Sequence, residues 1–317
     1  MSGVAKRMIE ITTTMTTPTT KFSPAALLLS LIAFLFSFMT FDVEAAPKIS
    51  SNYNKVKNGY NFWLVEPEGG VSEKKPVVIF LHGASLCGTD LNKVRRYGTL
   101  AAVEKGRKID AYVIAPQNPG GSWSPSKVMN ILNWVEENYN VDSDRVYVLG
   151  MSLGGYGTID FAATYPDKVA AAMAFCGGGT VKDLSGLGEL PLWIVHGTAD
   201  RAVSVSQSDR VVEAVKKSDG SRLYYDRISG WDHGKPARLF YLEETYDWLF
   251  SHRLSDKNRP AARKFALSSE TMRSAYAGLN HHAGYQGSSS KGAAKAKKTT
   301  ARKGRTYASR KSSKRRA

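Results

Sequence analysis

The central part of the chain alternates short apolar runs with longer stretches in which apolar residues recur every three or four positions. The apolar runs lie at 60–65, 77–81, 111–115, 146–149, 169–175, 192–195 and 223–225. The stretches with helical spacing lie at 127–139, 153–164, 206–217 and 239–252. Runs that are apolar at nearly every position are typical of strands buried on both faces. The pattern therefore predicts an α/β fold, in which helices on both faces cover a mostly parallel sheet.

A serine between two glycines directly follows one of these runs. Gly150, Ser152 and Gly154 form a G-x-S-x-G sequence between the predicted strand at 146–149 and the predicted helix at 153–164. Glycine at both flanking positions lets the helix approach the strand closely, and the sharp turn projects the serine hydroxyl beyond the sheet. Ser152 is therefore a candidate nucleophile. Because so short a pattern also arises by chance in a chain with 28 glycines, the assignment depends on its partners.

Two further loops at predicted strand ends carry the partners that a nucleophilic serine needs. Asp200 follows the run at 192–195, and His233 lies in a glycine-flanked loop after the run at 223–225. The serine, the acid and the histidine come in that order along the chain. Because the carboxyl ends of parallel strands meet at one edge of a sheet, we expect the three side chains to lie together there.

Four segments resemble the open-faced α/β-hydrolases of the dienelactone hydrolase, feruloyl esterase and prolyl-oligopeptidase-like group. They are LHGAS at 81–85, GMSLGGYGT at 150–158, HGTADRAVSVSQS at 196–208 and GWDHG at 230–234. The resemblance extends over about residues 50–255 and implies the α/β-hydrolase fold with a Ser-His-Asp triad. It does not identify a substrate, because many unrelated activities share this fold.

The resemblance implies a role for each member of the triad. His233 would remove the proton of Ser152 and later give it to the leaving group, while Asp200 would fix the imidazole tautomer. His82 and His196, which precede a glycine at a strand end, are expected to be structural hydrogen-bonding groups. The sequence leaves alternatives open, namely Asp226 and Asp232 for the acid and His252, His281 and His282 for the base.

The turn that follows the strand at 77–81 is expected to contribute to an oxyanion hole. In this fold, one donor is the backbone N–H of the residue after the nucleophile, which here is Leu153. The other would be the backbone N–H of Ala84, with that of Ser85 as the neighbouring alternative.

We expect the active site to be open, with no cap domain above it. Only residues 176–191 intervene where many lipases of this fold insert a cap. An open cleft suits polymeric or surface-attached substrates. Trp123 and Trp231 are candidates for substrate binding along such a cleft, and the alternative is that each packs on the fold.

Carboxylic esters and peptides pass through the same acyl-enzyme, so the sequence does not separate the two classes. We favour an esterase, because the chain offers no second domain that would gate peptides. A serine peptidase of prolyl-oligopeptidase type is the alternative. A further alternative is a non-catalytic protein that binds polyanions through its C-terminal segment.

The amino-terminal segment has the pattern of a secretory signal. An apolar run at 25–41 precedes small residues that would permit cleavage after Ala45. Its long leader allows translation to start at Met8 or Met15, and a membrane anchor is the alternative reading. The pattern predicts a secreted or periplasmic protein with no stable membrane span after cleavage.

The net charge of +16 comes almost entirely from the other end of the chain. Residues 258–317 hold sixteen basic residues and one acidic residue, whereas residues 47–257 are nearly neutral. A segment this basic and this poor in apolar periodicity is typical of disorder and of polyanion binding. We therefore expect three parts, namely a signal peptide at 1–45, a catalytic domain at 46–256 and a disordered basic tail at 257–317.

No cofactor or metal is expected. The sequence has no Cys/His pair with zinc spacing and no glycine-rich phosphate loop. Cys87 and Cys176 are the only cysteines, and burial as two free thiols is favoured over a disulfide.

Overall fold

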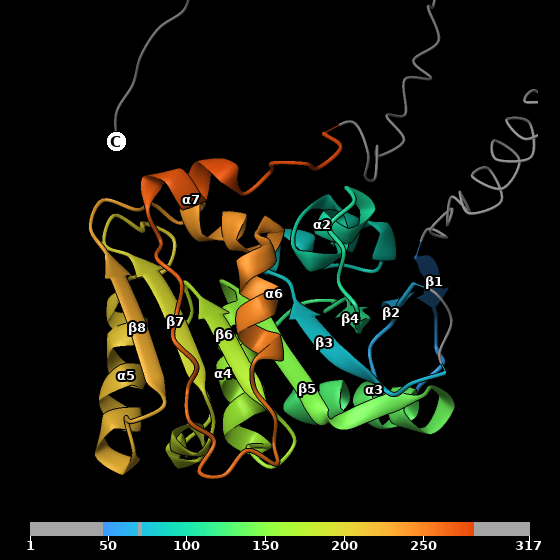
Figure 1. Cartoon of the computed structure of the whole chain (residues 1–317), viewed down its shortest axis with the longest axis horizontal. Helices are drawn as coiled ribbons and strands as arrows, with labels where there is room; N and C mark the ends of the chain where they lie inside the picture. The colour runs from blue at the N-terminus through green and yellow to red at the C-terminus, as the bar shows by residue number, and fades with distance from the viewer. Residues whose placement is uncertain (1–46, 69–71, 282–317) are drawn as a thin grey trace, which may run out of the picture. The chain divides into compact units, whose positions relative to one another are not determined.

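An eight-stranded sheet organises residues 47–68 and 72–281, the part of the chain that the computed structural model describes (Figure 1). The strands are β1 (Lys48–Asn52), β2 (Phe62–Glu66), β3 (Lys75–Leu81), β4 (Tyr112–Pro116), β5 (Val141–Met151), β6 (Ala171–Phe175), β7 (Leu192–Gly197) and β8 (Leu223–Ile228). They lie in the order β1-β2-β4-β3-β5-β6-β7-β8. The β1-β2 and β2-β4 pairs are antiparallel, and all other pairs are parallel. The predicted fold class is confirmed.

Helices cover both faces of this sheet. The α-helices are α2 (Thr99–Glu104), α3 (Pro125–Asn138), α4 (Leu153–Thr164), α5 (Ser206–Ser218), α6 (Glu243–Phe250) and α7 (Ser269–Ser274). The 3-10 helices are η1 (Ala84–Leu86), η2 (Leu91–Arg96), η3 (Ser185–Glu189) and η4 (Lys235–Tyr241). Helices α3, α4 and α5 contribute to the core on one face, and α2, α6 and α7 contribute to the core on the other.

The central strands contain uninterrupted apolar runs because successive side chains enter different cores. In β3, Val78 and Phe80 lie in the core with α2 and α6, whereas Val77, Ile79 and Leu81 lie in the core with α3, α4 and α5. All five side chains are fully buried. The period-two geometry of a strand thus turns an uninterrupted apolar run into two opposed apolar faces.

Two elements differ from the sequence-based expectation because their local pattern is weak. Strand β1 pairs only with β2 at the edge of the sheet, and its sequence Lys-Ile-Ser-Ser-Asn has little apolar character. The predicted helix at 239–252 is instead the 3-10 helix η4 followed by α6, because the backbone of Leu242 is extended. The hydroxyl of Thr245 donates to the carbonyl of Leu239 across this junction.

The predicted disordered tail at 257–317 needs correction, because residues 257–281 pack on the catalytic domain. Phe265 contacts the ring of Trp193, and Met272 and Ala275 of the α7 region are buried. The apolar anchors of this segment are irregularly spaced, so they give no periodic signal in the sequence. Residues 282–317, which include every basic residue from Lys291 onward, lie outside the described residues.

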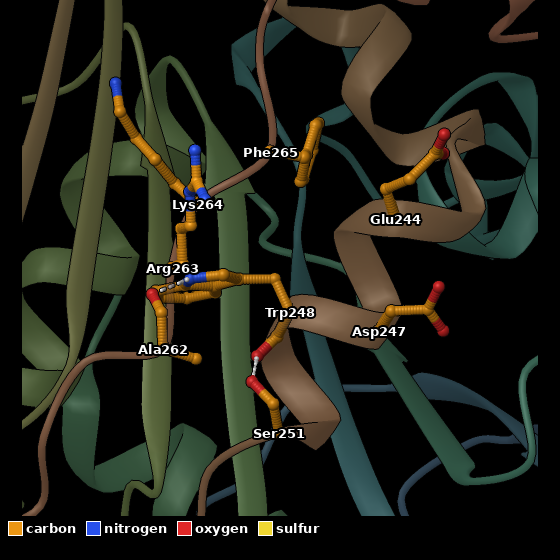
Figure 2. Close-up of a pocket in the computed structure, with 8 residues that line it drawn as sticks. All are labelled: Glu244, Asp247, Trp248, Ser251, Ala262, Arg263, Lys264 and Phe265. Atoms are coloured by element: carbon orange, nitrogen blue, oxygen red, sulfur yellow. Dashed lines mark hydrogen bonds between the residues drawn. The ribbon is translucent and has the colours of Figure 1, made fainter.

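Figure 2 shows where this segment passes helix α6. The indole Nε1 of Trp248 donates to the carbonyl of Ala262, and the hydroxyl of Ser251 donates to the carbonyl of Trp248. The Nε2 atom of His252 accepts the backbone N–H of Ala262. The segment at 257–267 therefore closes one side of the domain as part of its fold.

The predictions about a cap domain, a signal peptide, a membrane span and a disulfide are compared with the structure in turn. The connection from β6 to β7 contains only the short helix η3, so no cap domain is inserted there. The predicted signal peptide at 1–45 lies outside the described residues. Among the helices that the structure describes, none is long and apolar enough to cross a membrane. Cys87 and Cys176 are both free thiols.

Candidate active site

Ser152 occupies a strained turn between β5 and α4. Its backbone has φ 59° and ψ −123°, in a region that non-glycine residues rarely adopt. Its N–H donates to the carbonyl of Phe175, which fixes the turn against β6. A Cβ atom on Gly154 would lie 1.8 Å from the carbonyl oxygen of Leu81, so only glycine permits this approach of helix and strand.

The structure brings Asp200 and His233 into direct contact. The Nδ1 atom of His233 lies 2.7 Å from Oδ2 of Asp200. The other carboxylate oxygen accepts the backbone N–H groups of Ala202 and Val203 at 2.8 and 2.9 Å. Burial raises the pKa of Asp200, but the donors from Val203, His233 and Ala202 outweigh it and leave the pKa below its ordinary value. Asp200 is thus held as a carboxylate that orients the imidazole.

Ser152 and His233 line the same open pocket of about 370 Å³. Its other lining residues are Gly83, Ala84, Ser85, Tyr97, Met151, Ala202 and Ala237. A second hollow of about 550 Å³ shares Ala202 and His233 with it and extends toward Arg201. No hydrogen bond joins Ser152 to His233 among the described residues, and such contacts often tighten only with substrate bound.

Two helix starts beside Ser152 leave backbone donors available. Helix η1 begins at Ala84 and helix α4 begins at Leu153, and neither start has a side-chain cap. The first N–H groups of a helix have no intrahelical acceptor. The candidate oxyanion donors Ala84, Ser85 and Leu153 therefore lie in the first turns of two helices at the pocket.

Tyr97 is a pocket residue that the sequence analysis missed. Its hydroxyl oxygen accepts the backbone N–H of Gly83 at 2.8 Å and so fixes the turn before Ala84. Burial raises the pKa of Tyr97, which keeps the phenol protonated. No signal in the sequence links Tyr97 to Gly83, because the two residues are joined only through the fold.

The alternative acids and bases do not contact the dyad. Asp226 accepts from Nε1 of Trp193 and pairs with Lys264, and Asp232 accepts the backbone N–H groups of Gly234 and Lys235. His252 is buried, close to the point where the N–H of Leu254 donates to the carbonyl of Asp144 in β5. His281 is exposed. His282 lies outside the described residues.

Neither of the two tryptophans predicted to bind substrate lines the pocket. Trp123 is only 4% exposed, and its Nε1 donates to the carbonyl of His82. The prediction for Trp123 is corrected accordingly, because its large apolar ring packs in the core. Trp231 is half-buried, and its carbonyl accepts the N–H of Ala199. Substrate contact by Trp231 stays a prediction.

His82 is a fully buried hydrogen-bonding group. Its Nδ1 donates to the carbonyl of Gly83, and its Nε2 accepts the N–H of Asn118 at 3.0 Å. This pattern fits a neutral imidazole. Burial accordingly lowers the pKa of His82 from 6.5 to about 4.

We expect His82 to make the protein less stable in mild acid. Between pH 6.5 and about 4 the unfolded chain binds a proton at this histidine and the folded chain does not, so the free energy of unfolding falls as pH falls. The loss is about 3 kcal/mol across this window. Denaturant unfolding at several pH values measures it, with His82→Gln as the non-titrating variant. Equal pH slopes for the two proteins would contradict this account.

Comparisons with known proteins place this architecture in a family. A family model described as Esterase matches residues 54–222, more than half of the chain. The chain belongs to the Esterase family. Acetylxylan esterase A of Aspergillus ficuum is 29% identical over 135 residues, which are 38% of this chain and 43% of that protein. Poly(3-hydroxyalkanoate) depolymerase C of Paucimonas lemoignei is 27% identical over 230 residues, covering 56% and 54% of the two chains.

The alignments with these relatives of the Esterase-family chain cover only part of each relative's length. The chain spans from 19% to 54% of the length of the curated relatives it matches. Among solved structures, that of a thermostable esterase has a TM-score of 0.53 and 27% identity, and the match covers 66% of this chain and 63% of that one. The α/β-hydrolase resemblance drawn from the four sequence segments is confirmed.

Proposed function

We propose that this protein is an exported serine hydrolase that cleaves carboxylic esters on an accessible polymer- or envelope-linked substrate. The observation that carries the proposal is the Asp200-His233 hydrogen bond, with His233 and the strained Ser152 lining one open pocket. Membership of the Esterase family supports the same reaction class.

The proposed reaction proceeds in two acyl transfers. His233 takes the proton of Ser152 as the serine oxygen attacks the ester carbonyl carbon, and Asp200 steadies the resulting imidazolium. The carbon–oxygen bond to the alcohol then breaks, and His233 gives the proton to the departing oxygen. His233 then takes a proton from water as the water oxygen attacks the acyl carbon. The bond to the Ser152 oxygen breaks, His233 returns the proton to that oxygen, and the acid leaves. The N–H groups of Ala84 and Leu153 would stabilise both oxyanions, each donor contributing about 3 kcal/mol.

Two observations support a polymer-linked substrate. The pocket at Ser152 and a second hollow share Ala202 and His233 in their linings, so we infer that a large alcohol portion extends outward from the acyl site along His233. The relatives named acetylxylan esterase and poly(3-hydroxyalkanoate) depolymerase carry names that refer to esters of polymers. A short acyl group in the smaller pocket is therefore the preferred acyl portion.

A substrate panel tests the ester specificity. Purified protein would be offered p-nitrophenyl acyl esters, acetyl and feruloyl sugar esters, short poly(hydroxyalkanoate) oligomers and aminoacyl amides. Hydrolysis of the esters with much slower hydrolysis of the amides supports the proposal. Preferential amide hydrolysis would instead favour the prolyl-oligopeptidase type of serine peptidase.

We propose export by cleavage of the amino-terminal signal. The apolar run at 25–41 and the small residues before residue 46 support it. Amino-terminal sequencing of exported protein should find a chain that starts close to Ala46. An intact amino terminus in the membrane fraction would establish an anchor and contradict cleavage.

We propose that the basic residues after 281 tether the enzyme to polyanions. Twelve basic residues and no acidic residue lie between Lys291 and the end of the sequence. A chain ending at 281 should keep full turnover of small esters and elute from heparin at much lower salt than the full chain, because fewer counterions are released on binding. Elution of both proteins at the same salt would exclude a tethering role.

A further inference from the structure

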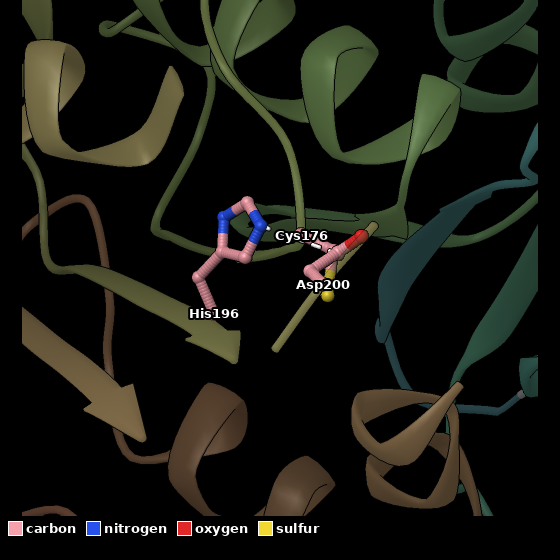
Figure 3. Close-up of side chains that lie close together, drawn as sticks. All are labelled: Cys176, His196 and Asp200. Carbon is pink, nitrogen blue, oxygen red and sulfur yellow. Dashed lines mark ion pairs between the residues drawn. The ribbon is translucent and has the colours of Figure 1, made fainter. Parts of the chain in front are cut away.

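A second imidazole contacts the carboxylate that orients His233. Figure 3 shows His196 beside Asp200 and Cys176. Nε2 of His196 lies 3.2 Å from Oδ2 of Asp200, the same oxygen that His233 contacts at 2.7 Å. The side chains of His196 and Asp200 are both fully buried. The candidate catalytic acid therefore has an imidazole on either side, of which only His233 reaches the pocket.

The neighbours of His196 determine where its proton lies. Nε2 faces two acceptors, the Asp200 carboxylate and the carbonyl of Val203 at 3.0 Å, so it must carry a hydrogen. Nδ1 lies 2.8 Å from the hydroxyl of Ser208, whose oxygen also lies 2.8 Å from the carbonyl of Gly177. The hydroxyl of Ser208 donates to the Gly177 carbonyl, and its oxygen also contacts Nδ1 of His196. Burial lowers the pKa of His196, which favours the neutral ring. His196 is thus a neutral donor to Asp200.

Cys176 and Asp232 are the other titratable groups near this contact, and the Cys176 thiol also interacts with the Asp200 carboxylate. Cys176, after β6, has its Sγ 3.8 Å from the carbonyl of His233, and burial raises the pKa of this thiol, so it remains protonated. Asp232 lies in the loop that carries His233 and accepts from its own loop.

The same cluster could be taken for a metal site. One ligand atom from each of Cys176, His196 and Asp200 lies within 4.8 Å of the other two. Ligation by His196 would require the Nε2 lone pair, yet this atom carries a hydrogen directed at Val203 and Asp200. The hydrogen bonds therefore favour a purely protein role for the cluster.

We propose that His196 is a positioning residue for the catalytic acid, which holds the loop at 198–203 and shares the negative charge that Asp200 presents to His233. The proposal rests on the proposed function. One N–H of His196 faces two acceptors of this loop, namely the Asp200 carboxylate and the Val203 carbonyl. Ser208, at the start of α5, in turn fixes the ring.

Three variants separate this role from simple core packing. His196→Leu removes the donor, His196→Gln places an amide N–H at a similar reach, and Ser208→Ala removes the hydroxyl that contacts Nδ1 and holds the ring of His196. In His196→Leu, Oδ2 of Asp200 loses one of its two imidazole partners and directs more of its charge at His233, which favours the imidazolium. We expect the titration midpoint of His233 to rise by about one pH unit and kcat to fall by about tenfold or more with little change in KM.

The decisive readout is the NMR titration of His233, which needs no turnover. Its ring signals are assigned by their loss in His233→Ala. The midpoint should rise in His196→Leu, rise less in Ser208→Ala and stay close to wild type in His196→Gln. If His196→Leu fails to fold, Ser208→Ala decides the question alone, and an unchanged midpoint in it overturns the proposal. Wild-type ester turnover is measured beside the titration, so failure of the proposed function is seen separately.

Discussion

Replacing His233 with alanine is expected to reduce kcat on a small p-nitrophenyl ester by about four orders of magnitude. His233 is the imidazole between Asp200 and the pocket that contains Ser152, so its loss removes the base and the acid of both acyl transfers. Its side chain is 28% exposed, so the melting temperature should hardly change. Asp200→Asn should reduce kcat about as much.

The two variants should differ in stability. The Asp200 carboxylate is fully buried and accepts from Ala202, Val203 and His233, so an amide N–H in its place would face other donors. We therefore expect Asp200→Asn to lower the melting temperature where His233→Ala does not. Steady-state kinetics and thermal unfolding measure both effects, with the exposed His281→Ala as the control. Retention of kcat within tenfold in His233→Ala would contradict the assigned base.

Gly154→Ala is expected to destabilise the whole domain. The added Cβ would lie 1.8 Å from the carbonyl oxygen of Leu81, which belongs to the buried strand β3 and cannot move aside. We expect a loss of about 3 kcal/mol or more, which corresponds to a fall in melting temperature of roughly 6 to 12 °C for a domain of this size.

Gly220→Ala is the matched control for this prediction. The nearest atom to its added Cβ is Cγ of Lys216 at 3.0 Å, part of a flexible side chain at the end of α5. This variant should melt close to wild type. Equal melting temperatures for Gly154→Ala and Gly220→Ala would show that the close approach of α4 to β3 does not depend on glycine.

Local sequence predicted much of the site because the fold places it at strand ends. Ser152 and Asp200 each follow a strongly apolar run, and runs of this kind mark central parallel strands. His233 follows the edge strand β8, whose apolar run is short. Gly154 is required because its backbone approaches the carbonyl of Leu81. The requirement comes from the backbone, so a glycine is expected at this position of the motif whatever the surrounding side chains are.

Features that depend on distant parts of the chain were not predictable in the same way. Tyr97 reaches Gly83 from outside the motifs, and Trp123 is buried by contacts with His82 and Tyr60. The segment at 257–281 joins the domain through irregularly spaced anchors such as Phe265, so its high charge concealed its packing. Such contacts are tertiary, and no periodicity of the local sequence encodes them.

Covalent labelling with a fluorophosphonate probe tests the central claim most directly. The account predicts that wild-type protein is labelled on Ser152, identified by mass spectrometry of the modified peptide. Ser152→Ala should fold with a wild-type melting temperature and take up no label, because the serine oxygen is the attacking atom. Equal labelling of the two proteins, or a label carried by another residue of the wild type, would contradict the assignment of Ser152 as the nucleophile.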